Sequence, residues 1–163
     1  MNKNWKILQP DIKAVRNLCD KMKCKPVMGI ILMNRQIFSP AEASRFFSSS
    51  LKELRPPFSI KDMDTAVRRI YTAITTHEKI LIFGDYDVDG ITATTLLFEF
   101  LRYTGADVSY YIPHRIREGY SLQTNHISDY VLPNQFHLII TVDCGSKSHE
   151  AVAMAQDSGT DVI

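Results

Sequence analysis

The second half of the chain alternates short apolar runs with segments of helical periodicity. Apolar runs typical of buried strands occupy residues 79–85, 107–113 and 136–143. Helical patterns follow them over residues 90–103, 125–132 and 146–158. A fourth strand begins at Asp161. This alternation predicts an α/β fold with a parallel sheet flanked by helices.

The first half of the chain reads differently. Its patterns predict short helices over residues 10–24 and 40–54, and the apolar stretch 27–37 between them fits either element type. A breaker, LRPPFSI, precedes an amphipathic helix over residues 66–74, which Asp62 or Asp64 is placed to cap. We therefore expect a mainly helical region over residues 1–76 and an α/β domain over residues 77–163. The domain should continue past Ile163, since a buried strand rarely starts so close to a natural end.

Composition excludes several classes of protein. Apolar residues make up 45% of the chain, which is enough for a packed core. No apolar run approaches the roughly 18 residues of a membrane span, and the N-terminus shows no secretory signal. The three cysteines form no C-x-x-C pair, as expected for reduced thiols. We expect a cytoplasmic protein without membrane contact.

The net charge of +1 conceals an asymmetry along the chain. Residues 1–25 carry seven Lys and Arg against two Asp and Glu, a net +5. Residues 26–79 carry +3, and residues 80–163 carry four against eleven, a net −7. An acidic half joined to a basic half fits a metal site beside a surface that attracts anions, although solvated charges can also fall unevenly.

The acidic half contains a cluster of chemical interest. Asp85, Asp87 and Asp89 alternate directly after the first strand, and Gly90 follows them. At an effective dielectric of about 20, two charges about 4 Å apart repel by roughly 4 kcal/mol. A compensating cation is therefore expected, and carboxylate ligands favour Mg²⁺ or Mn²⁺ over a softer metal.

A further aspartate, Asp143, ends the strand over residues 136–143. Ligands of parallel α/β sheets sit beyond the carboxyl ends of the strands, so both acidic groups should face one crevice. Together they could hold one or two divalent ions, which activate water and neutralise charge on a phosphoryl group. Gly90 permits a tight turn into a helix whose free N–H groups could meet a phosphate.

Three other interpretations fit parts of the aspartate pattern. An EF-hand shares the opening D-x-D-x-D-G, but Leu96 stands where its twelfth position needs Glu, and a strand precedes the loop. A phosphatase of the haloacid dehalogenase type carries D-x-D-G-T, whereas Ile91 stands here in place of Thr. The third interpretation is a purely structural role of these aspartates as turn and cap residues. The equivalent position of Asp143, at the end of another strand, argues against it.

Three motifs together resemble the DHH phosphoesterase superfamily, and within it the exonucleases specific for single-stranded DNA. They are GDYDVDG followed by ITATTLL, then YYIPHRIREGYSL, then LIITVDCG, in the order and spacing of that family. The resemblance spans roughly residues 45–163. It implies a Rossmann-like DHH-type fold, and metal-dependent hydrolysis of single-stranded DNA from 5′ to 3′ in recombination and repair.

The resemblance also implies roles for particular residues. Asp87, Asp89 and Asp143 match catalytic ligands of Mn²⁺ or Mg²⁺. Asp85 would be either a further metal ligand or a residue that contacts the ligands without touching the metal. Arg115 matches an arginine that could grip a substrate phosphate. Single-stranded DNA is the implied substrate, and a single-strand-binding protein is a candidate partner. An oligoribonucleotide or cyclic-dinucleotide phosphodiesterase of the same superfamily, or a metal-free binding module, stays open.

Two departures from the family pattern have consequences. Ser121 stands where the family usually has Gly after E-G-Y, which leaves the conformation of that loop open. The Asp-His-His motif should follow the strand that begins at Val162, and this sequence does not contain it. With carboxylates but no histidine ligand, we expect the chain alone to hold metal weakly and to be a poor nuclease or none.

Overall fold

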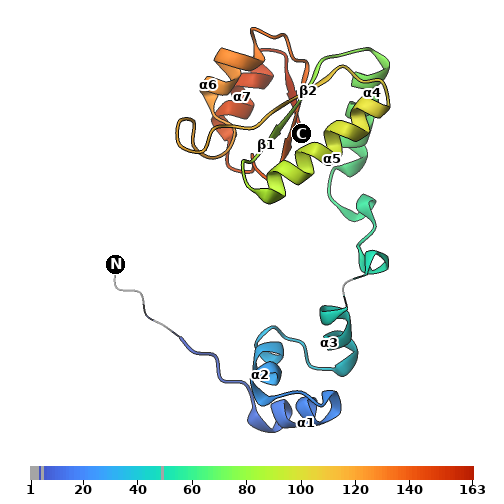
Figure 1. Ribbon diagram of the computed structural model, residues 1–163, viewed down its shortest axis with the longest axis vertical. Helices are drawn as coiled ribbons and strands as arrows, with labels where there is room; N and C mark the ends of the chain where they lie inside the picture. Colours follow the sequence, from blue (N-terminus) through green and yellow to red (C-terminus); the bar gives the residue numbers. More distant parts are fainter. Residues whose placement is uncertain (1–3, 5, 49) are drawn as a thin grey trace. The chain divides into compact units, whose positions relative to one another are not determined.

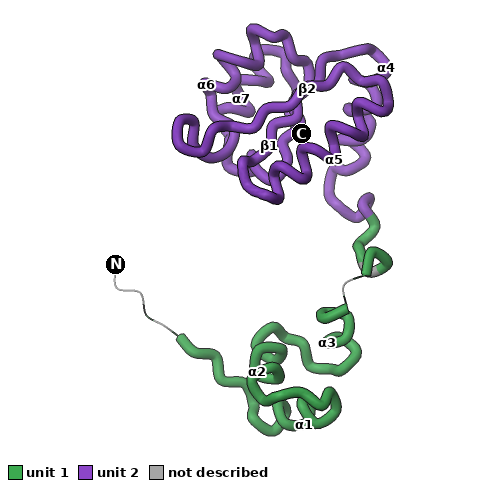
Figure 2. The backbone as a smooth tube through the Cα atoms, viewed as in Figure 1, with its two compact units in different colours: residues 1–56 green, residues 57–163 purple. Residues whose placement is uncertain are grey.

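The computed structural model describes residues 4, 6–48 and 50–163. The chain divides into two compact units, which we call unit 1 (residues 1–56) and unit 2 (residues 57–163) (Figure 2). Each unit is described by itself.

Unit 1 is built from short helices. They are α1 (Ile12–Met22), α2 (Pro26–Asn34), α3 (Pro40–Phe47) and a 3₁₀ turn at Leu51–Glu53. The apolar stretch 27–37, for which the sequence allowed either a helix or a strand, is therefore mainly helical. Pro26 occupies the first turn of α2, where a missing N–H is harmless. The buried side chains of Leu18, Leu32 and Ala43 join the three α-helices in one small core.

The helix predicted over residues 40–54 ends earlier than expected. It starts with a capping box between Ser39 and Glu42 and stops at Phe47. Serines follow it, and their side chains compete with the helix for backbone partners. Ser50 does so here, because its hydroxyl accepts the Lys52 N–H at 3.3 Å and starts a separate 3₁₀ turn.

Unit 2 contains a four-stranded parallel sheet, as the sequence predicted. Its strands are β1 (Ile80–Gly84), β2 (Val108–Tyr111), β3 (Leu138–Val142) and β4 (Asp161–Val162), in the order β2-β1-β3-β4. Every residue of β1 is buried, as expected for a central strand covered on both faces. In the β1–β3 register, Gly84 lies opposite Val142.

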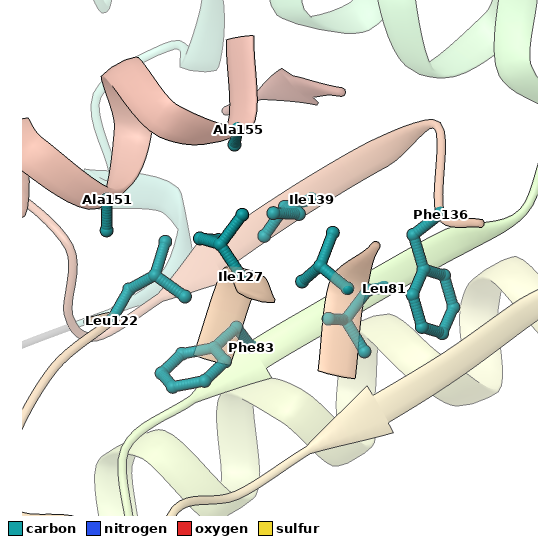
Figure 3. Close-up of a cluster of buried hydrophobic side chains, with 9 residues drawn as sticks. Leu81, Phe83, Leu122, Ile127, Phe136, Ile139, Ala151 and Ala155 are labelled. Carbon is teal, nitrogen blue, oxygen red and sulfur yellow. The ribbon is translucent and has the colours of Figure 1, made fainter. Parts of the chain in front are cut away.

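Helices cover both faces of this sheet (Figure 1). One face packs against α4 (Met63–Thr75) and α5 (Val88–Tyr103). The other packs against α6 (Thr124–His126), a π-helical turn (Ile127–Val131) and α7 (His149–Asp157). Figure 3 shows this second core, in which Leu81 and Phe83 of β1 lie beneath Ile127 and Leu122.

Helix α5 is less buried than its composition suggested. Its sequence has apolar residues on almost every side, but Leu96 is 75% exposed, Phe100 60% and Tyr103 91%. Since α5 lies on the outside of the sheet, only the face with Gly90, Thr94 and Leu101 is buried. In the described part of the chain, no helix has the length and apolar character needed to cross a membrane.

Helix α4 follows a 3₁₀ turn at Pro57–Ser59 and packs on the sheet of unit 2. Asp62 occupies its N-cap with a φ of 61°, but the Asp62 side chain makes no capping hydrogen bond, contrary to the capping role considered for it. Arg69 anchors the helix, because its guanidinium bonds Glu78 at 2.6 Å and Asp161 at 2.5 Å. The boundary between the two compact units lies between Pro56 and Pro57, upstream of the domain division that we expected after residue 76.

Candidate metal centre

The site lies where the chain reverses its path across the sheet. From β1 the chain crosses through α5 to the edge strand β2, and then passes to β3 on the other side of β1. The carboxyl ends of β1 and β3 thus border the crevice at which such sheets bind ligands. Because Gly84 and Val142 are paired, the next residues, Asp85 and Asp143, leave the two strands at the same level.

Three carboxylates meet at this point. Asp85, Asp87 and Asp143 each offer one oxygen, and these oxygens lie within 4.8 Å of one another. Asp85 is buried at 4% exposure, whereas the other two are exposed. The structure thus brings together three of the four predicted residues. Asp89 lies in the first turn of α5, is exposed and falls outside this group.

The start of α5 fixes Asp87. Its carboxylate accepts the N–H groups of Asp89 at 3.0 Å and Gly90 at 3.1 Å, so Asp87 is the N-cap of the helix. The helix start packs directly on the end of β1: a Cβ on Gly90 would stand 2.4 Å from the Asp85 carbonyl oxygen. Glycine is therefore required there for close approach, and this contact sets the spacing of Asp85 and Asp87.

A tight turn fixes Asp143. Its backbone is left-handed, with a φ of 58°, and Gly145 follows with a φ of 95°. Between them, the Cys144 thiol donates to the Phe83 carbonyl of β1 at 3.6 Å. The turn after β3 is thereby tied to the neighbouring strand, which keeps Asp143 beside Asp85.

The clustered carboxylates change the acidity of their neighbours. The pKa of Asp143 is raised by desolvation and then by the charges of Asp87, Asp89 and Asp85. The pKa of Tyr120 is raised by desolvation and by the charges of nearby carboxylates, Asp85 first among them. Burial and the charges of Asp85 and Asp143 raise the pKa of the Cys144 thiol to about 11. A strongly negative potential with only oxygen donors from the carboxylates fits a hard divalent cation.

An arginine and two aromatic rings lie next to the carboxylates. The Arg115 guanidinium carbon stands 5.4 Å from the centre of the Tyr86 ring. Tyr86 meets Tyr120 edge to face at 6.4 Å, and the Tyr120 hydroxyl donates to the Asp143 carbonyl at 3.4 Å. The sequence indicated Arg115 but not Tyr86. Its position between two clustered aspartates was the available signal.

The loop that carries Arg115 and Tyr120 is held from beneath by Glu118. This carboxylate accepts the Tyr111 hydroxyl and the His114 N–H. These hydrogen bonds lower the pKa of Glu118, and the bond to Glu118 raises the pKa of Tyr111 to about 12. The buried His126 ring lies 3.8 Å from the same carboxylate. Sequence reasoning missed this support, because Tyr111 and His126 come from separate elements.

The loop conformation left open at Ser121 is now defined. Ser121 has a φ of 72°, in the left-handed region that favours glycine. Its hydroxyl accepts the Gly145 N–H at 3.1 Å and bonds the Ser148 hydroxyl at 2.9 Å. The side chain thus compensates for the backbone cost by joining the loop to the turn after Asp143. An open groove of about 690 Å³ lies along this junction.

Fold and site together define an α/β domain with a cluster of carboxylates, a candidate metal centre, at the topological switch point. Residues 79–163 match the N-terminal domain of the DHH family, and this match covers more than half of the chain. The chain belongs to the DHH family.

Within that family the chain is similar to one kind of enzyme. It is 36% identical over 160 residues to the single-stranded-DNA-specific exonuclease RecJ of Bacillus subtilis (strain 168), covering 98% of this chain and 20% of the relative. A crystal structure of exonuclease RecJ bound to manganese matches 63% of this chain and 26% of that chain, at 33% identity and a TM-score of 0.59. RecJ of Thermus thermophilus in complex with Mn²⁺ shares the fold over 94% of this chain and 20% of that chain, at 22% identity and a TM-score of 0.60. The chain spans about a fifth of the length of the Bacillus subtilis relative.

Proposed function

We propose that this chain is the N-terminal part of a metal-dependent exonuclease that degrades single-stranded DNA from 5′ to 3′ in recombination and repair. The observation that carries the proposal is the meeting of Asp85, Asp87 and Asp143 within 4.8 Å at the carboxyl ends of two parallel strands. The similarity to RecJ supports the substrate class. Residues 1–76 would form its helical N-terminal region and residues 77–163 part of its DHH domain.

The three converging aspartates, with Asp89 beside them, are the proposed ligands of Mn²⁺ or Mg²⁺. A manganese-bound RecJ structure at 33% identity supports this choice of metal. The divalent ion would supply an activated water and neutralise charge on the phosphate. Asp87, Asp89 and Asp143 would be the catalytic set.

Residues around the carboxylates would hold the strand. Arg115 is the proposed phosphate contact, since a guanidinium pairs with phosphate through two parallel hydrogen bonds. The position of its guanidinium over the ring of Tyr86, which stands between Asp85 and Asp87 in the chain, supports this proposal. The groove between the Tyr120 loop and the start of α7 gives room for the strand to approach. We expect the enzyme to act in the cytoplasm, where a single-strand-binding protein would be its neighbour on DNA.

A chimera tests the function of the complete enzyme. The matching fifth of Bacillus subtilis RecJ would be replaced by this chain, which aligns with it over 160 residues. With Mn²⁺, the chimera should shorten single strands stepwise from the 5′ end. Asp87→Asn and Asp143→Asn should each reduce the rate by more than about 100-fold. This exceeds the loss that is typical when a residue that only hydrogen-bonds to a metal ligand is replaced. Asp157→Asn, at the far end of α7, is the matched control.

The isolated chain gives a second readout. We expect weak Mn²⁺ binding by calorimetry, abolished by Asp87→Asn and retained by Asp157→Asn, with little or no hydrolysis. Digestion by the chimera that survives Asp87→Asn and Asp143→Asn together would contradict the proposed centre. Removal of nucleotides from the 3′ end only would contradict the proposed polarity.

A further inference from the structure

The two units carry opposite charge. Unit 1 contains eleven Lys and Arg against four Asp and Glu, a net charge of +7. Unit 2 contains eight against fourteen, a net charge of −6. The positive charge therefore gathers in the unit that does not contain the carboxylate cluster. Such a charge excess attracts polyanions.

Helix α1 displays part of this charge on one face. Val15, Leu18 and Cys19 are buried on its inner face. Since a helix turns once every 3.6 residues, Lys13 falls opposite this face, with Arg16 on one side of it and Lys21 on the other, and all three are accessible to solvent. The exposed Asp20 lies between Lys13 and Arg16. They extend over about 12 Å of the helix axis, at 1.5 Å per residue. Within the described residues, none of these three side chains takes part in an ion pair.

Exposed aromatic rings occur in the same unit. Phe46 and Phe47 end helix α3 and meet edge to face at 5.5 Å, and they are 53% and 51% exposed. Phe38, just before that helix, is 60% exposed. Proteins that bind single strands without regard to sequence use cationic side chains to contact phosphates and exposed aromatic rings to stack on bases.

A nucleic acid fits this surface better than a membrane does. A helix that lies on a bilayer inserts its apolar face, but the apolar face of α1 is already used inside unit 1. Its outward face carries Lys13, Arg16 and Lys21 with the polar Asn17 and Asp20 among them, and one large apolar side chain of the helix, Ile12, is exposed at its start. An acidic protein would match the charge but would not explain the exposed phenyl rings as stacking surfaces.

We propose that unit 1 is a second binding surface for single-stranded DNA, with Lys13, Arg16 and Lys21 on phosphates and Phe46 and Phe47 on bases. The inference rests on the proposed function for the identity of the strand. It does not depend on the metal centre, because the contacts lie in a different unit. Its role would be to hold the strand on the enzyme between successive cleavage steps.

The test is fluorescence anisotropy of a labelled oligothymidine titrated with the full chain, in EDTA and over a series of NaCl concentrations. The triple variant Lys13→Gln, Arg16→Gln, Lys21→Gln removes three charges while keeping residues that favour a helix. If all three contact phosphates, the slope of log K against log[salt] should fall by about 2, and affinity in about 0.15 M salt should fall about 50-fold.

A matched variant controls for net charge. Lys61→Gln, Arg68→Gln and Arg102→Gln together remove three exposed charges from unit 2, and they should change affinity only slightly. Equal losses in both triple variants would overturn the proposal, as would binding of the α1 face to phosphatidylcholine–phosphatidylserine vesicles but not to DNA. Circular dichroism of each variant verifies that the helices are retained.

Two further variants separate the parts of the proposal. Phe46→Ala with Phe47→Ala should weaken binding about 5-fold or more with an unchanged salt slope, because stacking involves no counterion release. An unchanged affinity would refute the stacking role. Asp87→Asn with Asp143→Asn should bind DNA at least as tightly in EDTA as the unaltered chain. Failure of the metal centre and failure of the unit 1 surface are therefore distinguishable.

Discussion

Ser121 offers a test of how the loop beside the metal centre is held. It is a non-glycine residue with a φ of 72°, and its hydroxyl makes two hydrogen bonds, to the Gly145 N–H and the Ser148 hydroxyl. The left-handed backbone costs a residue with a Cβ about 1 kcal/mol relative to glycine. Each hydrogen bond contributes about 1 kcal/mol. The two effects oppose each other at one position, so two substitutions can separate them.

Ser121→Ala removes both hydrogen bonds and keeps the backbone cost. The free energy of unfolding of unit 2 should therefore fall by about 2 kcal/mol. Ser121→Gly also removes both bonds but relieves the backbone, so the loss should be only about 1 kcal/mol. The expected order of stability is the unaltered chain, then the glycine variant, then the alanine variant.

The chain supplies its own probe for this measurement. All seven tyrosines lie in unit 2, and the one tryptophan, Trp5, lies in unit 1. Urea unfolding followed by the tyrosine band in near-ultraviolet circular dichroism therefore reports on unit 2. Ser146→Ala is the control, since that serine lies in the same groove but outside the hydrogen bonds described. An alanine variant as stable as the glycine variant would refute the reasoning.

Three other perturbations test the site. Gly90→Ala should destabilise unit 2 by about 1–3 kcal/mol, because its Cβ would stand 2.4 Å from the Asp85 carbonyl oxygen, and urea unfolding measures this loss. Hydrogen bonds lower the pKa of Glu118 below its unfolded value, so its stabilisation is present above pH about 4.5 and is lost as the pH falls. Glu118→Gln should flatten this acid limb of the pH–stability curve, and an unchanged limb would contradict the role of Glu118. Mn²⁺ should raise the Tm of unit 2, and this shift should vanish in Asp143→Asn, since only the folded site gathers the carboxylates.

The α/β class could be predicted from the amino-acid sequence alone, because strand and helix periodicities are local properties. The runs over residues 79–85, 107–113 and 136–143 became β1, β2 and β3, each trimmed by a residue or two at its ends. The convergence of Asp143 on Asp85 and Asp87 also followed from the sequence. Parallel strands present their carboxyl ends at one edge, so residues that directly follow two such strands can meet there.

Tertiary packing decided what local pattern could not. Leu96 and Phe100 look like core residues in the sequence, but α5 lies on the outside of the sheet and leaves them exposed. Asp89 alternates with Asp85 and Asp87 along the chain, yet it lies in the first turn of the helix that begins at Val88 and is not one of the three carboxylates whose oxygens lie within 4.8 Å of one another. Side chains at alternate positions point in the same direction only where the backbone is extended, and not where it is helical.

The support of the Tyr120 loop also depended on the fold alone. Glu118 reaches Tyr111 of β2 and approaches His126 of α6, and the Ser121 hydroxyl reaches Gly145 after β3. Tyr111 and His126 lie in the strand and the helix on either side of the loop that carries Glu118, and Gly145 lies 24 residues from Ser121. Strand or helix periodicity does not join residues in this way. Hydrogen bonds between such side chains depend on where the backbone places them, which becomes fixed only when the sheet and its helices pack together.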